Sequence, residues 1–457
     1  MKVALVFPRF RYPSGDPPLG LGYLASAIQD KPGVHVDILD TTFESDPIRF
    51  LAETFRKAQY DIVGISLMSS MVSAGKIVAL LAKRARHDCK VVIGGPHPSV
   101  CPKDTLADEN VDAICIAEGE KSFSDLIDNY PRFEGLSGIW FKSGKEIVKG
   151  NPVRPVSDID SFSPPAWHLF SMQTYLRNWF QMDSVAAAGP GTSVMASRGC
   201  PNNCTFCQPT LRKLFGPVLR KRSPESIAEE IASLVRDFGL RSFMFQDDTF
   251  TIDPVWAVAV AQAVHTKNPQ VIWACNVHAN TVTGELLEEL HGYGLRKINM
   301  GIESASQRIL DEVYNKKTTV EQVKQAVKLA KQIDLVVQGY FMLGAPGETL
   351  DEINQTIRLA CKLPIDDATF SITTPLPGTI LFNQTCQMIG QNPIDYDYYA
   401  KPVYLSGNVL LPATLKSLKK KAYLKFYLSP NRWKNLARHL FLSGEPAKVL
   451  AKLRRLY

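Results

Sequence analysis

Hydrophobic and polar residues follow two different periods over the first 130 residues. Short apolar runs rich in Val and Ile, typical of buried strands, are separated by longer stretches with helical periodicity. Buried strands joined by amphipathic helices predict right-handed βαβ units and a doubly wound parallel sheet of the Rossmann-like kind. The predicted strands are 2–7, 34–39, 61–67, 90–95 and 111–117, and the predicted helices lie around 20–29, 47–58, 72–87 and 121–129.

A second α/β series follows a proline-rich segment. The sequence NPVRPVSDIDSFSPPAW (151–167) interrupts the pattern and predicts an extended linker. Six further apolar runs then alternate with helical stretches, two repeats short of an eight-stranded barrel, so we expect a partial, open barrel. Its strands are predicted at 192–197, 241–246, 271–276, 296–301, 336–343 and 367–372, with helices at 223–237, 253–265, 283–292, 306–313, 319–332 and 349–361.

These patterns divide the α/β chain into four parts. We expect a Rossmann-like domain over 1–135, a linker over 136–190, a partial (β/α)6 barrel of TIM type over 191–385, and a small basic helical region over 386–457. Between 412 and 457, twelve Lys and Arg residues accompany a single acid, Glu445, in a chain of net charge +7. Such a segment suits either a solvated helical face or peripheral contact with an anionic membrane surface.

The composition indicates in which cellular compartment the protein is located. No apolar run reaches the roughly 18 residues that a spanning helix needs, and the short apolar start MKVALVFPRF is typical of a buried first strand. Scattered cysteines in a chain of 457 residues fit a reducing cytoplasm better than a disulfide framework, so we expect a cytoplasmic protein. The six scattered cysteines, interpreted as mostly structural, are Cys89, Cys101, Cys115, Cys275, Cys361 and Cys386.

Polar and glycine residues gather where the strands of the predicted barrel end. In βα barrels the chemistry lies at the carboxyl ends of the strands, so these residues mark the candidate site. In strand order they are Cys200, Cys204 and Cys207; Asp247 and Asp248; Asn276 and His278; Glu303; Gly344 and Glu348; Thr373 and Pro375.

The stretch SRGCPNNCTFCQP (197–209) places three cysteines in eight positions. A zinc site would need a fourth Cys or His, which the loop lacks, and a disulfide would use only two of the three thiols. Iron–sulfur clusters are held by Cys thiolates, normally four, so three would leave one iron without a protein ligand. The spacing therefore favours an iron–sulfur cluster with one open position.

The second half of the chain resembles the radical S-adenosylmethionine (SAM) superfamily. The resemblance rests on C-x3-C-x2-C after the first barrel strand, GIES (301–304) after the fourth and GYFMLGAPGET (339–349) through the fifth. It implies that Cys200, Cys204 and Cys207 hold a 4Fe–4S cluster whose open iron is chelated by SAM. It also implies SAM contacts from Phe206, Asp247, Asp248, Glu303, Gly344 and Ala345, although QDDTF (246–250) lacks the glycines of the family's corresponding segment.

With the N-terminal domain included, the chain resembles the cobalamin-dependent radical SAM enzymes. The loops PPLGLGYLA, SLMSS, GGPHPS and EGE would surround a cobalamin, with Ser66, Gly94, Gly95 and Gly119 admitting it. The Asp-x-His-x-x-Gly motif that supplies an axial His to cobalt in many corrinoid proteins is absent. We therefore interpret His35 and His97 as structural residues or polar lining.

The resemblance implies a C-methyltransferase that acts on an unactivated carbon. A cyclase or a rearranging enzyme of the tetrapyrrole ring-closing type is the alternative. An RNA-modifying methylthiotransferase fits less well, because Cys89, Cys101 and Cys115 lack the spacing of a second cluster, and a non-catalytic corrinoid carrier would not need the cysteine loop. The residues themselves identify no catalytic acid or base.

The expected partners follow from the same resemblance. We expect a small-molecule substrate, an external electron donor such as flavodoxin or ferredoxin, and no nucleic acid. The aromatic stretch YDYYAKPVYL (395–404) and the basic tail lead to the hypothesis of a hydrophobic substrate taken up near a membrane.

Overall fold

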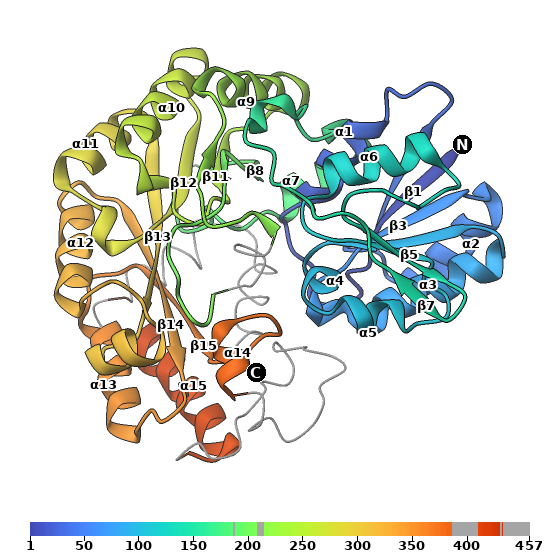
Figure 1. Ribbon diagram of the computed structural model, residues 1–457. Helices are drawn as coiled ribbons and strands as arrows, with labels where there is room; N and C mark the ends of the chain where they lie inside the picture. Colours follow the sequence, from blue (N-terminus) through green and yellow to red (C-terminus); the bar gives the residue numbers. More distant parts are fainter. Residues whose placement is uncertain (186–187, 208–213, 386–409, 430–431, 433–457) are drawn as a thin grey trace.

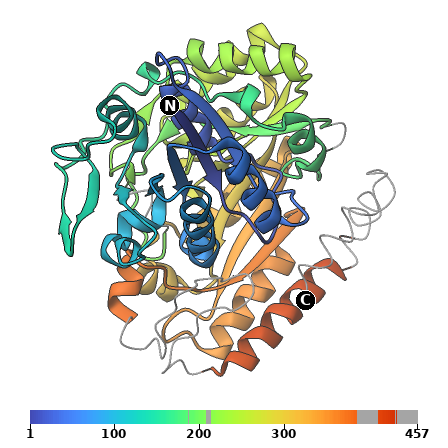
Figure 2. The same cartoon turned by 90° about the vertical axis from the view of Figure 1, so that its right-hand side faces the viewer.

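The computed structural model describes residues 1–185, 188–207, 214–385, 410–429 and 432. It contains two α/β units side by side, an N-terminal sheet and a curved half-barrel (Figure 1). Figure 2, seen from the side of the N-terminal unit, shows that unit in front of the barrel. In the part of the chain that is described, none of the helices combines the length and apolar character needed to cross a bilayer.

The N-terminal sheet is doubly wound, as predicted. Its strands have the order β2-β1-β3-β4-β5-β6-β7, and the first five are parallel. Helices α1 and α6 pack together, as do α2 and α3. The strands are β1 (Lys2–Phe7), β2 (His35–Asp40), β3 (Ile62–Ser66), β4 (Lys90–Gly94) and β5 (Ala113–Cys115), and the helices are α1 (Leu19–Ile28), α2 (Pro47–Ala58), α3 (Val72–Ala85), α4 (Pro96–Val100), α5 (Pro102–Leu106) and α6 (Gly119–Asn129).

An antiparallel hairpin extends this sheet and was not expected. Strands β6 (Ile139–Ser143) and β7 (Glu146–Val148) pair next to β5, within the stretch 136–190 for which the sequence indicated a linker. Ile139 and Phe141 are buried in the core, while Trp140 between them is partly exposed. This short alternation is the strand signal that the sequence analysis overlooked.

The second unit is a six-stranded parallel half-barrel, as predicted. The strands lie side by side in the order β15-β14-β13-β12-β11-β8, which is the reverse of their order along the chain. Helices cover the outer face (Figure 1). The core contains closely packed aromatic rings, including Phe245, Phe250 and Trp273. The strands are β8 (Gly191–Val194), β11 (Ser242–Phe245), β12 (Ile272–Val277), β13 (Leu295–Glu303), β14 (Val336–Leu343) and β15 (Asp367–Ile372), and the helices are α9 (Pro224–Phe238), α10 (Pro254–Lys267), α11 (Gly284–Gly292), α12 (Val320–Gln332) and α13 (Leu350–Lys362), with a π-helical turn at Ile309–Val313.

The described part of the basic tail is largely a packing element. Helix α15 (Pro412–Tyr427) buries Leu415, Leu418, Ala422 and Phe426 against the barrel core. The hydroxyl of Tyr423 accepts a hydrogen bond of 3.1 Å from the backbone N–H of Phe370 on β15. Residues 395–404 and 433–457 lie outside the described residues.

Asp16 ties the two units together from the loop after β1. Its carboxylate accepts hydrogen bonds from Trp179 Nε1 at 3.1 Å, from Gln181 Nε2 at 2.8 Å and from the hydroxyl of Ser193 on β8. The first loop of the N-terminal sheet is thereby fixed against the first strand of the barrel.

Replacing Asp16 tests this connection. We expect Asp16→Ala to lower the free energy of unfolding by about 2–4 kcal/mol, because three donors lose a charged acceptor. Chemical denaturation followed by circular dichroism measures the change. Asp30→Ala, at an exposed position of the same domain, is the control and should change stability by less than about 0.5 kcal/mol; equal effects of the two variants would contradict the role assigned to Asp16.

Candidate functional site

A cavity of about 440 Å³ opens at the carboxyl ends of the barrel strands. Its walls come from the cysteine loop, from the ends of β11, β12, β13 and β14, and from the helix α14 (Ile380–Thr385). The lining residues are Cys200, Asn202, Asn203, Cys204, Phe206, Cys207, Asp248, Thr249, Asn276, Val277, His278, Asn299, Gly301, Glu303, Lys316, Tyr340, Gly378, Thr379, Ile380 and Asn383.

Backbone contacts hold the cysteine loop over this cavity. Thr205 N–H donates to the carbonyl of Tyr314 at 3.0 Å, and the carbonyl of Thr205 accepts from Leu381 N–H at 2.9 Å. The ring of Phe206 lies edge-on to Tyr314, with centroids 4.8 Å apart. Gly199 has φ +93°, and a Cβ there would lie 2.3 Å from the carbonyl oxygen of Val218, so only glycine fits this turn before Cys200.

The three thiols of the loop suit a cluster better than a single ion. Cys200, Cys204 and Cys207 line the same cavity. Yet nowhere in the described chain do three His, Cys, Asp or Glu side chains converge as ligands of one metal ion. Burial raises the pKa of the Cys204 thiol, an effect that Lys316 partly offsets. Thiols spread around one cavity fit a larger group such as an iron–sulfur cluster.

The adjacent acids Asp247 and Asp248 differ in what they face. The Asp247 carboxylate is buried, accepts the Ala196 backbone N–H at 3.0 Å and the Ser197 hydroxyl, and does not line the cavity. It therefore fixes the strand that leads into the cysteine loop. Asp248 lines the cavity, and burial, together with the charge of Asp247, raises its pKa to about 7.

Glu303 also lines the cavity, as part of a buried ion pair. Lys316 Nζ lies 2.9 Å from Glu303 Oε1, and both side chains are at least nine-tenths buried. Glu303 has φ +62°, a rare conformation for a non-glycine residue, and lies at an irregularity of the β13–β14 pairing. Strain of this kind is typical of functional sites, where the surrounding structure holds it in place.

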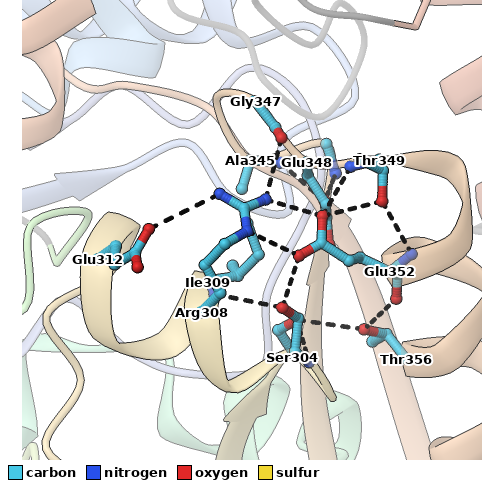
Figure 3. Close-up of polar contacts among 12 residues, drawn as sticks. Ser304, Arg308, Ile309, Glu312, Ala345, Gly347, Glu348, Thr349, Glu352 and Thr356 are labelled. Carbon is cyan, nitrogen blue, oxygen red and sulfur yellow. Dashed lines mark hydrogen bonds and ion pairs between the residues drawn. The ribbon is translucent and has the colours of Figure 1, made fainter.

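Gly344 and Ala345 lie outside the cavity, and their backbone donors are occupied. The Gly344 and Ala345 N–H groups donate to Glu348 Oε2 at 2.6 and 2.9 Å. Figure 3 shows Ala345 and Glu348 beside the ion pair of Arg308 and Glu352, whose Nη2 and Oε2 are 2.8 Å apart. Ala345 is packed in an apolar cluster against which Phe206 also packs. Ala345 therefore supports the wall behind Phe206.

Two asparagines of the cavity, Asn276 and Asn299, form a directional set, and the sequence had indicated only Asn276. The carbonyl of Asp247 accepts from Asn276 Nδ2 at 2.9 Å, and Asn276 Oδ1 accepts from Asn299 Nδ2 at 3.3 Å. This orientation leaves Asn299 Oδ1 buried with no hydrogen-bond partner among the described residues. The available signal was an Asn between the apolar residues Ile298 and Met300 of the strand RKINMG.

His278 presents a second acceptor of the same kind. Asn280 Nδ2 donates to the Lys317 carbonyl, so its Oδ1 is the acceptor that lies 2.5 Å from His278 Nδ1. The Asn280 backbone N–H lies farther from Nδ1, at 3.5 Å, so the shorter contact assigns the proton to Nδ1. Nε2 is then a buried lone pair without a partner among the described residues. Burial, and next the charge of Lys316, lower the pKa of His278 to about 4, so the imidazole is neutral.

The residues predicted to admit cobalamin lie at the carboxyl ends of the N-terminal strands. Ser66 ends β3, Gly94 ends β4, and both are partly exposed. A Cβ at Gly95 or Gly119 would lie 3.2 Å from Leu67 N or 3.0 Å from Leu24 Cδ2, whereas Gly94 has no neighbour closer than 3.6 Å. Of these three glycines, Gly94 is the one that has room on the side of its Cα where a Cβ would lie.

A smaller hollow of about 150 Å³ adjoins this edge, between the loop after β1 and the start of α3. Its lining combines the apolar or aromatic side chains of Phe10, Tyr12 and Met71 with the charged Arg9 and Arg11. His97 is buried and hydrogen-bonds Ser69 Oγ at 3.1 Å, and burial lowers its pKa to about 4. His35 is exposed at the opposite, amino end of β2.

Each of the two α/β units matches the model of a known protein family. The model of the Radical SAM superfamily matches residues 194–360, and that of the B12 binding domain matches residues 14–127. The chain belongs to the radical SAM enzymes that also carry a B12-binding domain.

Individual relatives fit this classification. The chain is 34% identical to an uncharacterized methyltransferase of Pyrococcus horikoshii over 91% of this chain and 88% of that protein. It is 26% identical to the anaerobic magnesium-protoporphyrin IX monomethyl ester cyclase of Cereibacter sphaeroides, over 94% of this chain and 70% of the cyclase. The fold is similar to that of the radical SAM methyltransferase TsrM from Kitasatospora setae, with a TM-score of 0.70, 19% identity, and 84% of this chain and 74% of TsrM covered.

The raised pKa of Asp248 predicts how stability depends on pH. In the unfolded chain this carboxyl titrates near 3.8, and in the folded protein near 7, so the folded state binds the extra proton between these values. The protonated Asp248 carboxyl therefore contributes to the stability of the folded protein at low pH, and this contribution is lost as the pH rises towards 7. Asp248→Asn should remove this loss, so the variant should gain about 2–3 kcal/mol relative to the natural protein between pH 5 and pH 8. Urea unfolding at the two pH values measures the gain, and parallel pH profiles would contradict it.

Proposed function

We propose that this chain is a C-methyltransferase that moves a methyl group from SAM to an unactivated carbon of a small molecule. One observation carries the proposal: a cavity with three cysteines from one loop lies in the same chain as a B12-binding sheet whose strand ends remain accessible. The relationship to the methyltransferase of Pyrococcus horikoshii supports methyl transfer as the outcome.

The cofactors have distinct residues available to them. Cys200, Cys204 and Cys207 would hold the 4Fe–4S cluster, and Ser66 and Gly94 would lie under the cobalamin. When bound, the cluster and SAM supply one-electron cleavage for hydrogen abstraction, and cobalamin supplies methyl transfer. The chain's own contribution is to orient the reacting groups and to keep water away from them.

Several cavity residues would orient SAM. Asp248 is an acceptor for its ammonium group, and Glu303, held by Lys316, is an acceptor for a ribose hydroxyl or the amine. The ring of Phe206, supported by Tyr314 and Ala345, would lie against the adenine. The carboxylate of Asp247 would act on the loop alone, since the Ala196 backbone and Ser197 occupy it.

The cavity wall also bears on the substrate. Asn299 Oδ1 and His278 Nε2 are acceptors that need donors, so they favour a ligand that brings O–H or N–H groups into the cavity. We retain the hypothesis of a largely hydrophobic substrate and add to it a polar, donor-bearing end. An external electron donor, no nucleic acid partner, a cytoplasmic location and membrane contact through the basic tail stay predictions.

A ring-closing or rearranging enzyme is the second candidate, and the relationship to the protoporphyrin ester cyclase favours it. The methylthiotransferase alternative finds less support in the structure. Cys89 precedes β4 at the amino edge of the sheet, whereas Cys115 is the last residue of β5, at the opposite edge. Burial raises the pKa of both thiols, to about 11 and about 12.

The cysteines give a direct test of the cluster. Cys→Ala at 200, 204 or 207 should abolish both the cluster and the formation of 5′-deoxyadenosine in anaerobically reconstituted protein. Iron and sulfide analysis, together with chromatographic detection of 5′-deoxyadenosine, measures the two losses. Cys361→Ala, in α13 on the outside of the barrel, is the matched control and should retain both. A full cluster in all three loop variants would refute the ligand assignment.

Methyl transfer is tested with isotopic label. Reconstituted protein that contains cobalamin is incubated anaerobically with methyl-labelled SAM, a reductant and a lysate of a related organism. We expect the label to appear in a small molecule at a carbon that has lost hydrogen. Product formation that requires SAM and cobalamin without incorporating label would instead favour the cyclase.

A further inference from the structure

A buried charge cluster joins the base of the cysteine loop to the N-terminal domain. The loop begins at β9 (Ser197–Arg198) and returns at β10 (Arg220–Lys221), and these strands pair antiparallel with Arg198 directly opposite Arg220. The two side chains are only 3% and 7% exposed. Facing like charges destabilise a strand pair, and burial strengthens their repulsion.

Glu118, from the loop after β5, bridges the two arginines. Its Oε1 accepts from Arg198 Nη1 and from Arg220 Nη2, both at 2.9 Å, and its Oε2 accepts from Arg220 Nη1 at 2.8 Å. Glu120 Oε1 adds a bond of 2.6 Å to Arg198 Nη2. Two carboxylates thus balance two guanidiniums, and Glu118 is the one that contacts both.

The surroundings leave the arginines little freedom to turn away. The Arg198 guanidinium lies 5.0 Å from the ring of Tyr23 and 5.1 Å from that of Phe162. Arg220 also donates to the carbonyls of Val156 at 2.7 Å and Phe215 at 3.0 Å. Because neither side chain can reach water without displacing these groups, the acids must neutralise the charges in place.

We propose that Glu118 is a positioning residue whose carboxylate keeps the two ends of the cysteine loop paired. Arg198 is two residues before Cys200, and the backbone at Gly199 between them passes so close to the Val218 carbonyl that a Cβ would lie 2.3 Å from its oxygen. The N-terminal domain therefore sets the geometry of the thiols in the barrel. The EGE loop, which the sequence assigned to the surroundings of cobalamin, holds the cysteine loop through its two acids. The consequence for the cluster rests on the proposed function; the pairing itself is a property of the chain without cofactors.

Hydrogen exchange of the full chain without cofactors tests the pairing. In Glu118→Gln, peptides that cover 196–200 and 218–222 should exchange at least about tenfold faster, while peptides from α10, α11 and α12 remain unchanged. Asp112→Asn is the matched control, since it breaks the ion pair with Lys83 elsewhere in the same domain and should leave both loop-base peptides unchanged.

A second variant separates charge repulsion from general damage. We expect Glu118→Gln to speed exchange at the loop base and to lower the iron content of the reconstituted protein. Removing one of the facing charges in Glu118→Gln/Arg220→Met should restore slow exchange and the iron content. The proposal is overturned if Glu118→Gln exchanges like the natural protein, or if the double variant is as fast as or faster than Glu118→Gln. Failure of the natural protein to assemble a cluster would defeat the proposed function alone.

Discussion

Parallel strands bring all their carboxyl ends to one edge of a sheet, and this constraint governs the whole molecule. The barrel strands deliver the cysteine loop, Asp248, His278 and Glu303 to a single cavity although they come from widely separated parts of the chain. The N-terminal strands deliver Ser66 and Gly94 to another edge. A chain that must bring two large cofactors to one substrate gains from having two such edges.

Loop geometry is then fixed from outside the loops. Asp247 ties the strand before the cysteines, Tyr314 and Leu381 hold the middle of the loop, and Glu118 closes its base. Each of these contacts comes from a different segment of the chain. The cysteines therefore depend on packing of the whole molecule, as expected for a site that needs preorganised ligands.

The fold could be predicted from the sequence because the strands are buried runs of standard length. All six barrel strands and the first five N-terminal strands lie within a few residues of their predicted positions. The hairpin β6–β7 was missed because its strands are short and one is exposed. Three cysteines in eight positions indicated the loop whose thiols line the cavity.

Side-chain roles were harder to predict than positions. Asp247 and Asp248 are neighbours, and only the structure shows that one carboxylate is occupied by the backbone while the other lines the cavity. Gly344 and Ala345 match a motif, but Glu348 takes their N–H groups. The role of Glu118 depends on two arginines 80 and 102 residues away, a pairing that no local pattern contains.

In the proposed function, the three cysteines of the loop would leave one iron of the cluster open for SAM. Electron–nuclear double resonance of the reduced, reconstituted protein tests this directly, with SAM labelled by ¹⁵N at its amine and ¹⁷O at its carboxylate. We predict hyperfine coupling of both nuclei to the cluster. A reduced cluster that shows no coupling to either label in the presence of saturating SAM would contradict the binding of SAM to the open iron.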